Sequence, residues 1–376
     1  MAKYKLEDIC EFITDGTHQT PEYCENGGVM FLSSKDVTDR RINWDKVKYI
    51  PDALHEKLYK RLSPKKNDIL LAKNGTTGVA AIVDRNVVFD VYVSLAVLRP
   101  LETIYPKYLL YAINSPVAKR QFDAGLKGIG VPNLHLGVIR NTIINIVSWE
   151  EQEKICKILD KVTILIDERK KELQLLDDLI KARFVEMFGD CKKLVSLGDL
   201  CLIITDGTHQ PPKFQDRGIP FILVSNLSKN TVTYNTEKYI NEETYNELYK
   251  RTPIETGDVL LSTVGSYGHP AVVVEDKKFL FQRHIAYLKP KRDIINSFYL
   301  HSALLSPNGQ HQIEEKVKGI AQKTLNLSEI KKIMIPLPSL DEQNEFEAFV
   351  KQIDKSKVAI LKNYSQGGVL SYDNQF

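Results

Sequence analysis

The hexapeptide Thr14-Asp15-Gly16-Thr17-His18-Gln19 is repeated 191 residues later as Thr205-Asp206-Gly207-Thr208-His209-Gln210. Further matches at nearly the same offset follow both copies in the same order. They are Leu58–Arg61 with Leu248–Arg251, Asp68–Leu71 with Asp258–Leu261, Ser115-Pro116 with Ser306-Pro307, Lys127–Ile129 with Lys318–Ile320, and Glu151-Gln152 with Glu342-Gln343. An ordered series of matches at one spacing indicates internal duplication. We therefore expect two copies of one unit, each a globular part followed by a helix.

The globular parts combine short strands with short helices. Apolar, often β-branched runs predict strands at 69–72, 79–83, 91–98 and 283–288. Residues 106–114 and 297–305 predict amphipathic helices that end at Ser-Pro. The sequence therefore predicts an α+β fold class for both copies.

A long helix is expected after each globular part. Residues 150–188 contain neither Pro nor Gly, and their apolar residues recur at steps of four and three, which is typical of a coiled-coil seam. The predicted seam consists of Ile155, Leu159, Val162, Ile166, Leu173, Leu176 and Ile180 in the first helix and Phe346, Val350, Ile353 and Ile360 in the second. Arg169 and Lys357 interrupt it. A single buried core helix is the alternative, which both length and register oppose.

The repeat and the helices together predict a domain organisation. It comprises a first globular domain at 1–149, a central spacer helix at 150–188, a second globular domain at 189–340, a distal spacer helix at 341–366 and a polar tail at 367–376. Because a helix as long as the central one needs a partner, we expect the two helices to lie antiparallel, in a pseudo-two-fold arrangement with the globular parts at opposite ends. The distal helix is shorter, so it can cover only part of the central one.

Composition excludes several classes of protein. The chain has 376 residues, 43% of them hydrophobic and 26% charged, as in ordinary soluble proteins and unlike disordered chains. No apolar run approaches the ~18 residues of a membrane span, and residues 1–14 lack the apolar core of a secretion signal. An odd number of cysteines, with no Cys-x-x-Cys pair, suggests reduced thiols and a cytoplasmic location.

The net charge of +3 is small for a protein that binds nucleic acid, but it is unevenly distributed. Residues 1–149 hold 20 basic and 16 acidic side chains (+4), and residues 189–340 hold 19 and 16 (+3). The helical segments 150–188 (8 against 10) and 341–376 (4 against 6) are each −2. Near-neutrality therefore does not exclude DNA as a partner, although it predicts weak binding by the chain alone.

Catalytic signatures are missing from the sequence. We find no G-x-x-x-x-G-K-[ST] phosphate loop, no Asn/Asp-Pro-Pro-Tyr/Phe methyltransferase motif and no G-x-S-x-G nucleophile elbow. No His or Cys pair has a zinc-finger spacing. We therefore predict no catalytic residues and no metal ligands.

Two related globular units, each followed by a coiled-coil helix that begins near Glu-Gln, resemble the specificity subunit of a type I restriction-modification enzyme. The Thr-Asp-Gly-Thr-His loop, the Asp-Ile-Leu-Leu stretch followed by two glycines, the Lys-Gly loop and Pro-Leu-Pro-Ser-Leu-Asp-Glu-Gln at 336–343 carry the resemblance. It implies a non-catalytic subunit that serves host defence. It also implies target-recognition domains that each read one half of a bipartite site in double-stranded DNA, with the helices setting the spacing.

The resemblance also implies partners. Two methyltransferase subunits would use S-adenosylmethionine, and restriction subunits would use ATP and Mg²⁺, whereas this chain would bind no cofactor and no membrane. Two other readings remain open: a methyltransferase-nuclease with fused recognition domains, which the missing motifs oppose, and a truncated or stand-alone DNA-binding module without an active methyltransferase partner.

Base edges are read by Arg, Lys, Asn, Gln, Ser or Thr on exposed loops, and four regions carry such residues. The repeated hexapeptide offers Thr17, His18, Gln19, Thr208, His209 and Gln210. The loop between the paired strands offers Lys73, Asn74, Thr76 and Thr77 in the first copy and Ser266 and Tyr267 in the second. The hexapeptide could instead belong to the fold, since Asp-Gly favours turns. The loop could be a surface hairpin that has merely diverged.

The other two regions are basic. One follows the first strand of each unit and contains Lys35, Arg40, Arg41, Asn226 and Lys229, which suit phosphate contacts. The other is the Lys-Gly loop with Lys127, Lys318, Gln322 and Lys323, a candidate clamp on the DNA backbone. Solvated surface charge and an ordinary glycine loop are the competing explanations.

Overall fold

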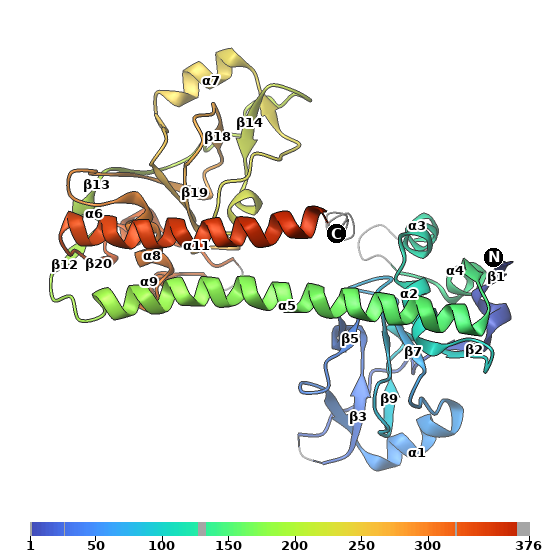
Figure 1. The fold of residues 1–376 in the computed structure, drawn as a ribbon. Coiled ribbons are helices and arrows are strands. Elements are labelled where there is room, and N and C mark those ends of the chain that lie inside the picture. The colour runs from blue at the N-terminus through green and yellow to red at the C-terminus, as the bar shows by residue number, and fades with distance from the viewer. Residues whose placement is uncertain (1, 26, 127–132, 320–321, 367–376) are drawn as a thin grey trace. The chain divides into compact units, whose positions relative to one another are not determined.

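The computed structural model describes residues 2–25, 27–126, 133–319 and 322–366 (Figure 1). Contacts divide the chain into two compact units, residues 1–166 and 167–376. The long helix α5 (Trp149–Phe188) begins in the first unit and ends in the second. The expected tail at 367–376 lies outside the described residues.

The first unit is built on a four-stranded antiparallel sheet with the strand order β2-β10-β7-β8. The same unit also contains a three-stranded sheet, β6-β3-β9, and two two-stranded sheets, β1-β11 and β4-β5. The strands are β1 (Ala2–Lys5), β2 (Cys10–Asp15), β3 (Val29–Leu32), β4 (Val37–Thr38), β5 (Arg41–Ile42), β6 (Lys48–Ile50), β7 (Ile69–Ala72), β8 (Ala80–Ile82), β9 (Phe89–Val91), β10 (Leu95–Pro100) and β11 (Ile143–Ile146). The helices are η1 (Leu6–Ile9), η2 (Ser34–Asp36), α1 (Asp52–Arg61), α2 (Pro106–Ile113), α3 (Pro116–Gly125) and α4 (Leu136–Asn141).

The second unit repeats this topology. Its sheets have the orders β13-β19-β16-β17, β15-β14-β18 and β12-β20, which match three sheets of the first unit; the β4-β5 pair has no counterpart among the described residues of the second. The strands are β12 (Leu194–Ser196), β13 (Cys201–Asp206), β14 (Ile219–Ile222), β15 (Tyr239–Ile240), β16 (Val259–Ser262), β17 (Pro270–Val272), β18 (Leu280–Phe281), β19 (Ile285–Pro290) and β20 (Met334–Pro336). The helices are α6 (Leu197–Leu200), η3 (Val224–Leu227), α7 (Glu242–Tyr249), α8 (Ser297–Leu305), α9 (Pro307–Lys316), α10 (Leu327–Ile330) and α11 (Leu340–Gln366). The two units therefore share one α+β architecture.

The burial of strand β7 explains why the residues that follow Asp68 form an unbroken apolar run. All four of its residues are fully buried. Ile69 and Leu71 belong to one hydrophobic cluster, and Leu70 and Ala72 belong to another on the opposite face of the strand. A strand covered on both faces reads as an unbroken apolar run rather than an alternating one.

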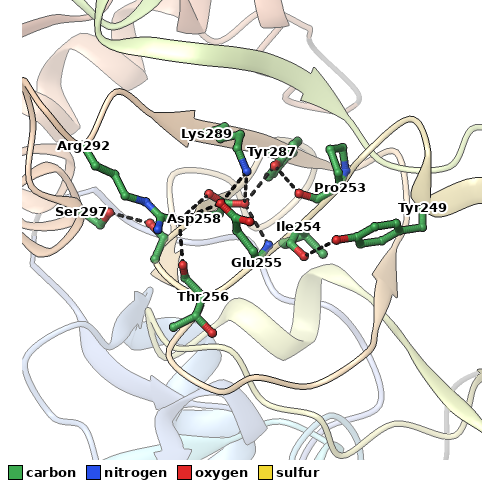
Figure 2. A network of polar contacts seen from close by, with 11 residues as sticks. Tyr249, Pro253, Ile254, Glu255, Thr256, Asp258, Tyr287, Lys289, Arg292 and Ser297 are labelled. Atoms are coloured by element: carbon green, nitrogen blue, oxygen red, sulfur yellow. Dashed lines mark hydrogen bonds and ion pairs between the residues drawn. The ribbon is translucent and has the colours of Figure 1, made fainter.

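The aspartate that precedes β16, the equivalent strand of the second unit, is also structural. Asp258 is fully buried and accepts hydrogen bonds from the Tyr287 hydroxyl at 2.9 Å and the Glu255 amide at 3.0 Å (Figure 2). Arg292 lies 3.3 Å from the same carboxylate. Burial raises the pKa of Asp258, and these contacts hold it against that cost. Its counterpart Asp68 is held instead by Arg99 (2.9 and 2.8 Å).

The repeated Glu-Gln motif ties each long helix to its globular part. Gln152 is buried and accepts a hydrogen bond from the Tyr105 amide at 2.8 Å, just before α2. Gln343 is buried and accepts one from the Asn296 amide at 2.8 Å, just before α8. Each side-chain amide also donates to a carbonyl just before its own helix, that of Val147 in the first case and that of Pro338 in the second. A buried amide with both ends satisfied fixes the direction in which the helix leaves the domain.

Within the second unit, the end of α5 packs against α11. Phe184 and Phe188 lie 5.5 and 5.6 Å from Phe346 between ring centroids. Further along α11, Lys357 lies 2.6 Å from Asp177 of α5. Residue numbers fall along α5 as they rise along α11, so these segments run antiparallel.

The predicted seam residues have low exposure. Phe346, Val350 and Ile353 are buried. The remaining members are half-buried; they are Ile155, Leu159, Val162, Ile166, Leu173, Leu176, Ile180 and Ile360. Lys357, which interrupts the seam, has a side chain only 20% exposed.

One strand prediction was wrong. Residues 91–98 form parts of two strands, because β9 ends at Val91 and β10 begins at Leu95. Strand β9 pairs in parallel with β3, whereas β10 pairs antiparallel with β2 and β7. The chain therefore crosses from one sheet to the other through residues 92–94, and apolar residues on both sides of the crossing hide it in the sequence. The second copy likewise starts β19 at Ile285 rather than at 283.

Candidate nucleic-acid interface

The repeated hexapeptide forms the end of a strand and the corner that follows it. In the first unit the Thr17 amide donates to the Val91 carbonyl at 3.0 Å, and in the second the Thr208 amide donates to the Phe281 carbonyl at 3.0 Å. A Cβ atom on Gly16 would lie 1.9 Å from the Val91 carbonyl oxygen. Glycine is therefore required here by close backbone approach, as the structural interpretation of the motif predicted.

The histidine of the hexapeptide is not required by the fold in this way. The side chains of His18 and His209 are 73% and 53% exposed. Their Nε2 atoms lie 3.4 Å from Asp15 and 2.9 Å from Asp206, respectively. Each imidazole is thus oriented by the aspartate three residues before it while remaining at the surface. Thr17 and Thr208 are half-buried, and Gln19 and Gln210 are exposed.

The aspartate of the hexapeptide forms an ion pair in both units, but its basic partner comes from a different part of each unit. Lys73 is buried, and its Nζ lies 2.6 Å from Asp15. In the second unit threonine occupies the equivalent position 263, and Arg251 binds Asp206 at 2.6 Å. The expectation that Lys73 contacts DNA is therefore wrong: its charge is used inside the domain, where an unpaired carboxylate would be costly.

The hairpin tips, residues 73–77 and 263–267, have the same backbone form. Gly75 and Gly265 have φ values of +75° and +72°. The side chains around them differ in exposure and partners. Thr76 is exposed and donates to the Val37 carbonyl at 3.1 Å, Asn74 and Thr77 are half-buried, and Ser266 is exposed. The Asn74 Oδ1 atom is buried and has no hydrogen-bond partner among the described residues.

In the second unit the hairpin tip meets the Lys-Gly loop. The Leu325 amide donates to the Thr263 carbonyl at 2.8 Å, and the Gly265 amide donates to the Lys323 carbonyl at 3.2 Å. Lys318 is 70% exposed, and Gln322 is also exposed. Four predicted residues from distant parts of the sequence therefore share one surface; they are Tyr267, Lys318, Gln322 and Lys323. Lys127 of the first unit lies outside the described residues.

Glu314 of α9 organises this surface and was missed by sequence reasoning. Its carboxylate accepts hydrogen bonds from the Tyr267 hydroxyl and from Lys323 at 2.9 Å. Lys323 also lies 3.2 Å from the Tyr267 hydroxyl. The hydrogen bonds from Tyr267 and Lys323 lower the pKa of Glu314, and the bond from Tyr267 has the larger effect. No sequence signal separated Glu314 from other charged residues of a helix face.

The remaining basic region is divided between surface and core. Lys35, Arg40 and Arg41 are exposed in the first unit, and Lys229 is exposed in the second. Asn226, however, is buried: its Nδ2 donates to the carbonyls of Thr233 and Asn235, and its Oδ1 accepts from the Leu223 amide. The prediction that Asn226 contacts DNA is therefore wrong, because its amide is saturated by the backbone.

The repeated Leu-Tyr-Lys-Arg segment brings an arginine to the hexapeptide corner in each unit. Arg61 ends α1 and donates to the Asp15 carbonyl at 2.8 Å, whereas Arg251 follows α7 and binds the Asp206 carboxylate. In the second unit, residues 207–213 and the end of α7 enclose a cleft of about 400 Å³. The repeat itself was the signal that could have connected these helices with the hexapeptide.

The cysteines and the potential metal ligands that the structure describes form no second kind of site. All five cysteines are free, and burial raises the pKa of Cys10 and Cys201 to about 12 and that of Cys156 to about 11. The described residues contain no cluster of His, Cys, Asp or Glu suited to hold a metal ion. Among the same residues, no helix is sufficiently long and apolar to span a membrane.

Comparison with known proteins places this duplicated architecture in a family. The model of the type I restriction modification DNA specificity domain matches residues 1–176 and, a second time, residues 191–366. The chain belongs to this family. Specificity subunits of this family are non-catalytic.

Individual relatives are distant in sequence. The specificity subunit of the type I restriction enzyme EcoBI from Escherichia coli is 26% identical over 263 residues, which are 61% of this chain and 55% of that protein. The chain thus spans about half the length of this relative. The MjaVIII specificity subunit from Methanocaldococcus jannaschii is 22% identical and is matched over 81% of this chain and 77% of its own. The solved S subunit from M. genitalium has a TM-score of 0.49 and 15% identity, covering 99% of this chain and 94% of the other.

Proposed function

We propose that this chain is the DNA-recognition subunit of a type I restriction-modification complex, and that each unit reads one half of an asymmetric bipartite site in double-stranded DNA. The observation that supports this proposal most directly is that the two units share one backbone architecture but carry different side chains at the hairpin tip. The hexapeptide corner and the sheet order recur in both units, whereas Thr76 and Thr77 are replaced by Ser266 and Tyr267. Different hydrogen-bonding groups on one frame would select different base edges.

The spacing between half-sites would come from the long helices. We propose that α5 and α11 form an antiparallel coiled coil that relates the two units by a pseudo-two-fold axis. The antiparallel contacts of Phe184 with Phe346 and of Asp177 with Lys357 support this arrangement. The recognition domains would then comprise 1–149 and 189–340, and the spacer helices 150–188 and 341–366.

The outer surface of α5 would dock the methyltransferase subunits. Six aliphatic side chains on this helix are between 45% and 63% exposed, and none of them is a predicted seam residue. They are Ile158, Ile164, Leu165, Leu175, Leu179 and Val185. At 100° per residue all of these positions except Val185 fall within about one third of the helix circumference, and an exposed apolar stripe of this kind indicates a protein partner.

The proposed partners would supply the chemistry. Two methyltransferase subunits would use S-adenosylmethionine, and restriction subunits would use ATP and Mg²⁺; this chain would hold none of these. Partners would also contribute much of the phosphate neutralisation, because the chain's net charge is only +3.

A second candidate is a stand-alone or truncated DNA-binding module. The observation that favours it is the shorter second helix, since α11 has 27 residues and α5 has 40. Co-expression with a methyltransferase subunit separates the two functions. A stable complex that selects a bipartite motif from a random duplex library supports the specificity subunit. A chain that selects DNA but never co-purifies with that subunit supports the stand-alone module.

A further inference from the structure

The hexapeptide corner and the end of the neighbouring helix carry the same basic residue types in both units. The first unit has His18, Lys60 and Arg61, and the second has His209, Lys250 and Arg251; we call each set a His-Lys-Arg corner. The lysine and arginine are the last two residues of α1 in the first unit and directly follow α7 in the second, and all four side chains are exposed. Neighbouring charges are not shared in this way.

Two positions beside the corner illustrate the contrast. Lys213 and Glu247 line the cleft of the second unit, and their sequence counterparts in the first unit are Glu22 and Lys57. The charge at each of these positions is therefore reversed between the units. The residues of the His-Lys-Arg corner are therefore identical in the two units, whereas the charges beside it differ.

The hexapeptide aspartate beside each His-Lys-Arg corner is already paired with basic side chains, which reduces its repulsion of an anion. In the second unit the two carboxylate oxygens of Asp206 are occupied by His209 and Arg251, at 2.9 and 2.6 Å. In the first unit those of Asp15 are occupied by His18 and Lys73. Because the histidine Nε2 atom faces the aspartate in both units, the Nδ1 edge of an exposed ring is left for an external ligand.

From this geometry we infer that each His-Lys-Arg corner binds a phosphodiester group of the DNA backbone, independently of base sequence. The inference rests on the proposed function and divides the work within each unit. An element that is identical in two units that read different half-sites cannot distinguish them, whereas phosphates are the same at every site. The corners would supply register and affinity, and the differing hairpin tips would supply specificity.

The test compares lysine and histidine variants of the full chain on a mixed-sequence duplex of 40 base pairs. We expect Lys60→Ala and Lys250→Ala each to lower the slope of log affinity against log salt by about 0.9, because one phosphate contact is lost. Loss of a charge-assisted hydrogen bond in His18→Ala and His209→Ala should weaken binding by about tenfold on all sequences alike. The matched controls are Lys355→Ala on α11 and His311→Ala on α9, whose histidine is 71% exposed; both should leave binding unchanged.

Selection from a random duplex library provides the second measurement. Each corner variant should yield the motif selected by the unchanged chain, at lower affinity. Basic residues at helix C-termini can also serve only to stabilise the helix; an unaltered salt slope in both lysine variants would establish that role and overturn the inference. A changed base preference in one half-site would also overturn it. Failure of the unchanged chain to select a bipartite motif when it is in complex with a methyltransferase subunit would instead reject the proposed function.

Discussion

The Nζ atom of Lys73 lies 2.6 Å from the Oδ2 atom of Asp15, and both side chains are buried. This ion pair connects the start of a hairpin tip with the hexapeptide corner, two loops that are 58 residues apart in sequence. The second unit reaches the same aspartate with Arg251, which comes from a helix instead of the hairpin. The two units therefore hold the hexapeptide aspartate with different basic residues. The hairpin of the second unit does not need a lysine for this purpose, so its sequence can differ.

Replacement of Lys73 should destabilise the first unit. Lys73→Met leaves the Asp15 carboxylate buried without its cation, a loss that typically costs about 3–5 kcal/mol. Thermal unfolding followed by circular dichroism should show a lower transition temperature, whereas Lys355→Met on the surface of α11 should not change it. An unaltered transition in Lys73→Met would indicate that solvent reaches the pair and would restore Lys73 as a candidate for DNA contact.

Glu314→Gln should alter the half-site read by the second unit. Its carboxylate holds both Tyr267 and Lys323, so a neutral amide should release the lysine and reorient the hairpin tip. Motif selection should show changed base preference at positions in one half-site only. The counterpart change Asp123→Asn, which removes a partner of Lys119, is the matched control and should leave that half-site unchanged. Equal changes in both halves would contradict the assignment.

Lys357→Leu should stabilise the packing of α11 on α5. The lysine interrupts an apolar seam, and the side chains of its partners Asp177 and Asp354 are each 53% exposed, so their carboxylates remain solvated when the lysine is removed. A leucine at this position would bury apolar surface in the seam, which should stabilise the packing by about 1 kcal/mol. The midpoint of denaturant unfolding of the second unit should rise. A fall in the midpoint would mean that the ion pairs of Lys357 with Asp177 and Asp354 contribute more than the leucine would.

Thiol reactivity should divide the cysteines into two groups. Burial raises the pKa of Cys10 and Cys201 to about 12 and that of Cys156 to about 11, so at pH 8 these remain protonated and unreactive in the folded chain. Cys24 and Cys191 are half-buried. A thiol-specific reagent should therefore modify two groups rapidly in the folded chain and five in denaturant. Rapid modification of Cys156 would show that the start of α5 is open to solvent.

Insertion of seven residues into α5 should lengthen the recognised spacer. One heptad adds about 10 Å of helix and preserves the seam. Because α11 pairs with the end of α5, the insertion belongs near residue 164, away from that overlap. The selected motif should keep both half-sites and gain about three base pairs between them. An unchanged spacer would refute the role of the helix as a ruler.

The duplication and its consequences could be predicted from the sequence because they depend on order and periodicity. The offset repeat anticipated two units of one architecture, and the step of four and three anticipated α5 and the low exposure of its seam. The crossing between β9 and β10 could not be seen, because a buried strand and a buried crossing are both apolar. Lys73 and Asn226 misled because a residue type suited to DNA is equally suited to a buried ion pair or a saturated turn, and only the fold decides which.

The most direct test of bipartite recognition is methylome sequencing of a host with the gene for this chain intact and deleted, in the presence of its methyltransferase partner. We predict that one methylated motif disappears on deletion, and that it consists of two different half-sites separated by a fixed number of unspecified base pairs. A methylome that is unchanged by deletion, or loss of a single uninterrupted motif, would contradict the account.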